Sequence, residues 1–163
     1  MAKRYEPLFA FLRRKEGLRL RAYLDDADVW TIGYGHAILD EKGRQLRGAA
    51  NEATAIRCSQ SPITKTQAER LLQGDVRIAL RAVARHVRVP LRPSQRMALA
   101  SWTFNLGELR LRQSTLLRKL NDGDYGAVPL EMKRWVRGGG RILGGLVTRR
   151  DQEVAMWTQG TFA

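Results

Sequence analysis

The most informative segment of the chain reads Glu16-Gly17-Leu18-Arg19-Leu20-Arg21-Ala22-Tyr23-Leu24-Asp25-Asp26-Ala27-Asp28-Val29-Trp30-Thr31-Ile32-Gly33-Tyr34-Gly35-His36. Its residues 20–24 and 29–34 are rich in apolar, aromatic and β-branched side chains, which favour strands. The three aspartates between these two runs are turn formers. The segment therefore predicts a small antiparallel β-hairpin.

A short amphipathic helix is expected immediately before this hairpin, because apolar residues recur at helical spacing between basic ones over residues 7–15. Gly17 suits the left-handed backbone position that ends a helix, which places Glu16 on the last turn. Partial burial there would favour the protonated form of Glu16 and suit a general acid, whereas Asp25 in its polar turn would stay ionised. Two carboxyl groups in such different environments are typical of glycoside hydrolysis, although a solvated surface acid fits the same spacing.

The second strand of the hairpin is expected to have one open face. Side chains alternate along a strand, so Thr31, Gly33 and Gly35 would share one side and the bulky residues between them the other. A face with one hydroxyl and two glycines would leave room for a flat polar substrate close to the backbone.

The segment from Glu16 to His36 resembles the signature of the phage lysozymes of the T-even type, the muramidase endolysins of glycoside hydrolase family 24. A second stretch, Ser114 to Tyr125, followed by Arg134-Trp135 and a glycine-rich run over 138–150, is similar to the C-terminal half of the lambdoid-phage members. The resemblance covers nearly the whole chain and is weakest over 39–62.

The resemblance implies an α+β, lysozyme-like fold in a single domain spanning 1–163. A small N-terminal hairpin lobe would occupy about 14–62 and a larger helical lobe about 93–160, with residues 1–13 packed on the latter. A long helix over about 64–86 would join them. The residues support that helix independently, because Thr64-x-x-Gln67 is a capping box followed by apolar residues at helical spacing.

The implied activity is hydrolysis of the β-1,4 bond between N-acetylmuramic acid and N-acetylglucosamine in peptidoglycan, with inversion and lysis of the host cell as the outcome. By this resemblance Glu16 is the general acid, while Asp25 and Thr31 manage the attacking water. Two other readings remain. A lytic transglycosylase would also use one catalytic Glu but release an anhydro sugar, and a cationic module without enzymatic activity would act on membranes or nucleic acid.

The resemblance also singles out four further residues. Phe104 and Ser114 align with family positions near the sugar cleft, although core packing and helix capping are the favoured explanations, because a buried Phe and an N-cap Ser need no other purpose. His36 is expected to form an ion pair with Asp75 that joins the lobes, and the family chemistry needs no catalytic imidazole. The other histidine, His86, lies among arginines and is expected to be exposed.

Beyond the long helix, several helices are expected in the C-terminal part. The expected features are a nearly all-apolar helix capped by Ser94 and ending at Gly107, a helix capped by Ser114, a helix over 124–136, a loop over 138–145 and a last helix capped by Thr148-x-x-Asp151. An apolar helix of this kind is typical of the centre of a helical bundle.

Charge is the dominant feature of the composition. The chain of 163 residues carries a formal net charge of +13, and residues 61–163 hold 18 Lys or Arg against 8 Asp or Glu, compared with 11 against 8 in residues 1–60. Such a surface attracts polyanions. For a lysozyme these are peptidoglycan strands and anionic outer-membrane lipids, the latter through the basic C-terminal lobe. The same charge would suit nucleic acid, which is not an expected partner of this family.

Other sequence features argue against additional chemistry. The single Cys58 excludes an internal disulfide, and the two histidines are fifty residues apart, so no metal site and no cofactor is expected. Residues 7–12 form too short an apolar run for a secretory or membrane-spanning segment. The resemblance to the phage lysozymes then implies a monomer that accumulates in the host cytoplasm and reaches the wall through a separate membrane pore.

Overall fold

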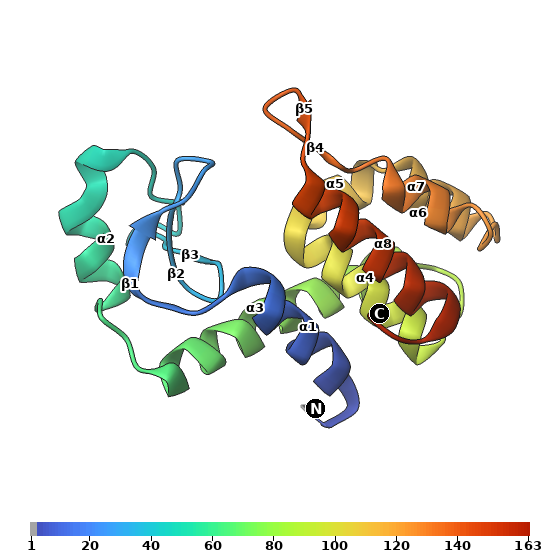
Figure 1. Ribbon diagram of the computed structural model, residues 1–163, viewed down its shortest axis with the longest axis horizontal. Coiled ribbons are helices and arrows are strands. Elements are labelled where there is room, and N and C mark those ends of the chain that lie inside the picture. Colours follow the sequence, from blue (N-terminus) through green and yellow to red (C-terminus); the bar gives the residue numbers. More distant parts are fainter. Residues whose placement is uncertain (1–2) are drawn as a thin grey trace. The chain divides into compact units, whose positions relative to one another are not determined.

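A computed structural model describes residues 3–163 of the chain (Figure 1). They divide into two compact units. The N-terminal unit is Leu12–Asp75, and the C-terminal unit is Val76–Ala163 together with the described residues up to Phe11. Of the segment 1–13 that was expected to pack on the helical lobe, the first two residues lie outside the described part.

Helix α1 (Glu6–Glu16) is the amphipathic helix that the sequence predicts. Its apolar face is buried. The helix ends at the expected place, because Gly17 adopts a φ of +65° and donates its N–H to the carbonyl of Arg13. Glu16 is thus the last residue of the helix, and its side chain is half-buried.

Three antiparallel strands form the sheet of the N-terminal unit. They are β1 (Arg19–Leu24), β2 (Trp30–Gly33) and β3 (His36–Ala37), in that spatial order. The predicted hairpin is confirmed as the β1–β2 pair, in which Tyr23 lies opposite Thr31. The aspartate-rich segment between the two strands forms the turn, as expected.

Helix α3 (Lys65–His86) begins with the predicted capping box. The Thr64 N–H donates to Gln67 Oε1 over 2.7 Å, and the Gln67 N–H donates to Thr64 Oγ1 over 3.2 Å. The buried face of the helix consists of Ala68, Leu72, Val76, Ala79, Ala82 and Val83. The division between the two units falls within this helix, after Asp75.

Strand β2 is shorter than predicted. It ends at Gly33, whose φ is +67°, and the chain turns through Gly35 into β3, where His36 pairs with Ile32. A Cβ atom added at Gly33 would lie 3.4 Å from the Cβ of Ala68 on α3. The prediction of an open strand face at the two glycines is therefore wrong, because packing against α3 fills the space beside Gly33 and a turn replaces the extended strand.

The segment between the sheet and α3 contains a turn and a helix that was not predicted. The Gly43 N–H donates to the carbonyl of Asp40, and the Asp40 N–H donates to that of Arg44, so the chain reverses at Lys42-Gly43. Helix α2 (Glu52–Ser59) follows and packs on β1 and β2 (Figure 1). Its periodicity gave little signal, because Ala55 is the one buried residue among its eight.

The C-terminal unit is a set of helices around one apolar helix. Its elements are α4 (Pro93–Leu106), α5 (Glu108–Gln113), α6 (Thr115–Asn121), α7 (Val128–Lys133), the strands β4 (Arg137–Gly138) and β5 (Arg141–Ile142), and α8 (Gly144–Gln159). Helix α4 packs along α8, which α7 also contacts (Figure 1). Trp102 on α4 is fully buried, which confirms this helix as the centre of the unit. The helix begins one residue before Ser94, because Pro93 takes the first helical position.

Three predictions for the C-terminal part are wrong in detail. The segment 124–136 contains only the short helix α7, and the expected loop over 138–145 contains the β4–β5 hairpin. Gly139 and Gly140 both have positive φ, which permits a two-residue hairpin turn. Helix α8 begins at Gly144, so Thr148 lies inside it and donates its hydroxyl to the Gly144 carbonyl rather than capping the helix.

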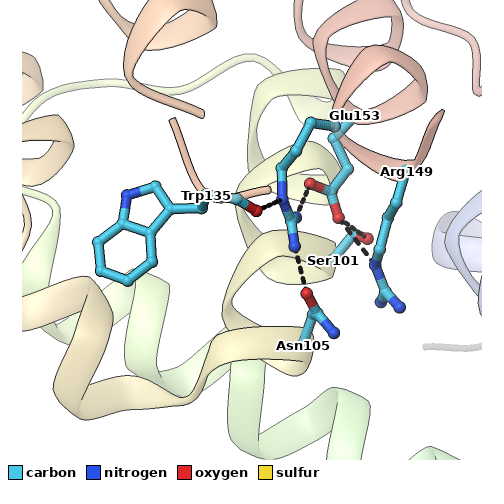
Figure 2. A network of polar contacts seen from close by, with 6 residues as sticks. Ser101, Asn105, Trp135, Arg149 and Glu153 are labelled. Atoms are coloured by element: carbon cyan, nitrogen blue, oxygen red, sulfur yellow. Dashed lines mark hydrogen bonds and ion pairs between the residues drawn. The ribbon is translucent and has the colours of Figure 1, made fainter. Parts of the chain in front are cut away.

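A buried polar network lies within the C-terminal unit (Figure 2). Glu153 on α8 is completely buried, accepts a 2.6 Å hydrogen bond from Ser101 on α4 and pairs with both Arg149 and Arg150. Arg150 is also buried, and it donates to the carbonyl of Trp135 and to the side chain of Asn105. Burial lowers the pKa of Arg150, against the opposing effect of the Glu153 carboxylate. The network fixes α8 to α4 and to the chain after α7.

Candidate active site

The carboxyl group of Glu16 lies at the turn that joins β2 to β3. A Cβ atom built on Gly35 would stand 3.1 Å from Glu16 Oε2 and 3.5 Å from the carboxyl carbon. Gly35 has a φ of +75°, a backbone conformation that glycine adopts without penalty. The glycine therefore leaves space that the Glu16 carboxyl group fills, so this acid belongs to the sheet region as well as to the end of α1.

Asp25 is held by the backbone of the turn that it begins. Its Oδ1 accepts 2.9 Å hydrogen bonds from the N–H groups of Ala27 and Val29, and its own N–H donates to the Val29 carbonyl. This arrangement uses one carboxylate oxygen for structure and leaves Oδ2 directed at Thr31, whose Oγ1 is 3.5 Å away. The half-buried side chain of Asp25 is thus oriented before any ligand arrives.

The hydroxyl of Thr31 is buried and oriented by the strand. Its Oγ1 lies 3.1 Å from the carbonyl of Val29, the shorter of its two polar contacts. Because a hydroxyl has one proton and two lone pairs, donation to Val29 leaves the oxygen free to accept. A water molecule can then donate one hydrogen to Thr31 Oγ1 and the other to Asp25 Oδ2, which orients an oxygen lone pair away from the hairpin.

Tyr23 belongs to the same cluster but was not predicted as a site residue. It lies opposite Thr31 in the β1–β2 pair, and directly opposed residues of antiparallel strands project to the same face. Burial raises the pKa of Tyr23, and the carboxyl groups of Asp25 and Glu16 add to the rise. Both acids are therefore within electrostatic range of one phenol. The sequence could have indicated Tyr23, because side chains alternate along a strand and a residue two positions before Asp25 lies on the same face.

A second set of contacts ties α1, the β2–β3 turn and α3 together within the N-terminal unit. Glu69 on α3 pairs with Arg13 on α1 at 3.0 Å and accepts a 3.0 Å hydrogen bond from the hydroxyl of Tyr34. The Arg13 guanidinium and then the Tyr34 hydroxyl hold the pKa of Glu69 below its ordinary value, although burial opposes them. Arg13 lies three residues before Glu16 and Tyr34 directly precedes Gly35, so the network through Glu69 restrains the segments that carry the acid and the glycine.

The contact expected between His36 and Asp75 is present in the structure. His36 Nδ1 lies 2.8 Å from Asp75 Oδ2 and 3.1 Å from Oδ1, with both side chains about one quarter exposed. The contact becomes an ion pair when the imidazole is protonated. Both residues belong to the N-terminal unit, so this contact links β3 to α3 inside that unit and does not join the two lobes as expected.

The two predicted sugar-binding residues belong to the C-terminal unit. Phe104 is half-buried near the end of α4. Ser114 is buried at the N-cap of α6, where its hydroxyl accepts from the Leu117 N–H over 3.0 Å and donates to the Leu111 carbonyl over 2.8 Å. The capping role of Ser114 is therefore confirmed, and any contact of either residue with sugar stays a prediction.

A pocket of about 390 Å³ lies elsewhere in the N-terminal unit. Its walls come from the sheet, α2 and the first turns of α3, and include Ile32, Cys58 and Leu71. None of Glu16, Asp25 and Thr31 lines it, so this pocket is not the place where the two acids meet a ligand.

The part of the chain that the structure describes offers no group of three His, Cys, Asp or Glu side chains placed to hold a metal ion. Among the helices within residues 3–163, none has both the length and the apolar character needed to cross a bilayer.

The chain is similar to known phage proteins over most of its length. Residues 13–153 match the family model described as phage lysozyme. The chain is 35% identical over 150 residues to an endolysin of Acyrthosiphon pisum secondary endosymbiont phage 1, covering 90% of this chain and 91% of the relative. It is 36% identical over 148 residues to an endolysin of Bacillus phage PZA, covering 90% of this chain but only 51% of that relative. The chain thus spans about half the length of this second relative.

A solved structure agrees with the sequence comparisons. The endolysin from Escherichia coli O157:H7 phage FAHEc1 superposes with a TM-score of 0.76 at 29% identity, covering 97% of this chain and 94% of that one. The α+β lysozyme-like fold predicted from the sequence is therefore confirmed. Since the family model spans most of the chain and its relatives share about a third of its residues, this chain belongs to the phage lysozyme family.

Proposed function

We propose that this protein is an endolysin that hydrolyses the β-1,4 bond between N-acetylmuramic acid and N-acetylglucosamine of peptidoglycan, and so lyses the host cell. The observation that carries the proposal is that Asp25 Oδ2, the carboxylate oxygen that the turn does not use, lies 3.5 Å from the Thr31 hydroxyl in the unit that also holds Glu16 beside Gly35. Membership of the phage lysozyme family supports the same conclusion.

In the proposed mechanism Glu16 donates its proton to the leaving glycosidic oxygen. Asp25 accepts a proton from a water molecule that Thr31 also binds, and this water attacks the anomeric carbon from the opposite face of the sugar. The bond to the leaving sugar breaks as the bond to water forms, so the anomeric configuration inverts. Room for the water requires carboxyl groups roughly 6.5–9.5 Å apart.

Digestion of purified peptidoglycan tests the assignment. We expect new reducing ends of inverted anomeric configuration, detected by NMR of the earliest products, and their complete loss in Glu16→Gln with an unchanged melting temperature. Glu52→Gln, an exposed acid at the start of α2, serves as the control and should retain activity. Appreciable turnover by Glu16→Gln or a retained anomer contradicts the mechanism, and an anhydro sugar identifies a lytic transglycosylase instead.

A second activity on anionic membranes is favoured by the β4–β5 hairpin. Ile142 and Leu143 are 59% and 43% exposed, and the neighbouring Arg137 and Arg141 are also exposed. Apolar side chains beside cations are suited to a surface of anionic lipid. We expect leakage of vesicles that contain anionic lipid, unchanged in Glu16→Gln and reduced in Ile142→Ser. Equal leakage of vesicles made only of zwitterionic lipid contradicts this second activity.

A further inference from the structure

Tyr23 presents an unengaged hydroxyl on the face that carries Thr31. Tyr23 is half-buried, and within residues 3–163 its hydroxyl has no hydrogen-bond partner. Tyr34 provides the contrast, because its buried hydroxyl donates to Glu69. The raised pKa of Tyr23 keeps its phenol protonated at neutral pH. A neutral donor thus lies beside the two proposed catalytic acids, free for a ligand.

Arg19 lies over the ring of Tyr23. Its guanidinium carbon is 4.2 Å from the ring centroid, a cation–π contact that holds the long side chain in place. Arg19 is exposed, and it forms no ion pair with any acid in the described part of the chain. A guanidinium that stacks on a ring still has its N–H groups available in its own plane. Two of these N–H groups can donate to the two oxygens of one carboxylate.

We propose that Arg19 and Tyr23 together bind a carboxylate of the peptide carried by N-acetylmuramic acid. The inference rests on the proposed function, because that sugar forms one side of the bond to be cleaved and its lactyl group carries the stem peptide. The carboxylates of this peptide are the anionic groups of the substrate close to the scissile bond. Arg19 supplies the positive charge and two parallel N–H donors. Tyr23 supplies a neutral hydroxyl donor and the aromatic ring that orients the guanidinium.

A carboxylate explains this pair better than a sugar hydroxyl does. A neutral sugar hydroxyl can be bound by neutral donors and acceptors such as Asn, Gln or backbone groups, so it gains little from the charge of a guanidinium. Arg19 stacks on the ring of Tyr23 and forms no ion pair with Asp25 or Asp26, so its charge remains available to an external anion. The pair is a positioning and specificity site, separate from the groups that transfer protons.

The test removes the charge from each side of the proposed contact in turn. Purified peptidoglycan is used as isolated and after its carboxyl groups are converted to amides. On amidation we expect the parent kcat/KM to fall by about tenfold, mostly through KM, the change that about 1.4 kcal/mol produces. Arg19→Gln should show a similar fall on the native substrate and little further loss on the amidated one. Tyr23→Phe should lose part of the preference at an unchanged melting temperature.

Arg21→Gln is the matched control, because it removes the same charge from an exposed position on the same strand. It should retain the parent preference for the native substrate. If Arg19→Gln keeps the full preference for native over amidated peptidoglycan, the proposal is overturned. If Arg21→Gln loses as much of this preference as Arg19→Gln does, the proposal is also overturned, because the preference then comes from the general field of a chain with net charge +13.

Binding separates failure of this inference from failure of the proposed function. Co-sedimentation with insoluble peptidoglycan measures the Kd of Glu16→Gln and of Glu16→Gln combined with Arg19→Gln. We expect the second variant to bind native peptidoglycan about tenfold more weakly and amidated peptidoglycan equally well. If the parent releases no reducing ends but this binding difference holds, the proposed function fails and the carboxylate site stands. Equal binding of native peptidoglycan by both variants overturns the site.

Discussion

Gly35 and the carboxyl group of Glu16 occupy one place in the structure: a Cβ atom on Gly35 would stand 3.1 Å from Glu16 Oε2. Contacts this short are rarely found for real Cβ atoms, so an alanine would displace the carboxyl group or the turn. The glycine is therefore tied to the position of the proposed acid.

The Gly35–Glu16 contact predicts that Gly35→Ala loses most of its muramidase activity. The positive φ of Gly35 costs an alanine about 1–2 kcal/mol, and the new methyl group moves Glu16 in addition. Gly43→Ala separates the two effects, because Gly43 has the same φ of +75° and no atom within 4 Å of an added Cβ. Release of reducing ends and thermal melting measure both variants. Equal activity in the two variants at equal stability would show that the contact is not needed.

The divided role of Asp25 predicts different outcomes for two substitutions. Asp25→Asn keeps an oxygen that accepts from the N–H groups of Ala27 and Val29, so the variant should be as stable as the parent. The amide cannot take a proton from water, so the variant should lose its hydrolytic activity. Asp25→Ala removes both hydrogen bonds and should lower the stability as well, by about 1–3 kcal/mol. Asp26→Asn, in the exposed part of the same turn, should change neither property. Near-normal hydrolysis by Asp25→Asn is the result that removes this residue from the mechanism.

The ion pair of Glu69 predicts a pH dependence of stability. Its folded-state pKa is lowered from an ordinary 4.5, chiefly by Arg13, so its contribution to stability is present above about pH 4.5 and is lost as the pH falls through the folded-state value. Glu69→Gln should be less stable than the parent at pH 6, and the difference should shrink as the pH decreases. Urea unfolding at several pH values measures it, with Glu52→Gln as the reference. A difference that does not depend on pH would refute the electrostatic origin.

The network of Figure 2 predicts a large loss of stability in Glu153→Gln. The substitution leaves the buried guanidinium of Arg150 without a countercharge, which costs about 3–5 kcal/mol. Asp151→Asn is the control on the same helix, because the pair of Asp151 with Lys133 is about half exposed and exposed pairs contribute about 0–1 kcal/mol. Denaturant unfolding compares the two variants, and similar losses in both would contradict the prediction.

Local chemistry accounts for the elements that were predicted well. The capping box at Thr64, the N-cap at Ser114 and the helix-ending Gly17 each act through hydrogen bonds within a few residues, so the sequence reveals them. Helix α2 and the β4–β5 hairpin were missed, because the first buries little apolar surface and the second has strands of two residues. His86 was wrongly expected to be exposed. It is half-buried, and its Nε2 lies 2.7 Å from Glu108, a partner twenty-two residues away in the chain.

The amino-acid sequence by itself determined the helix that ends at Glu16, the hairpin that carries Asp25 and Thr31, and the family resemblance, because each depends on residues close together in the chain. Only the tertiary structure decided that Gly33 packs on Ala68, that Gly35 makes room for the Glu16 carboxyl group, and that Tyr23 lies with Arg19 on the Thr31 side of the sheet. These relationships depend on strand register, on where β2 ends and on the packing of α3 against Gly33, and folding alone brings the residues concerned together.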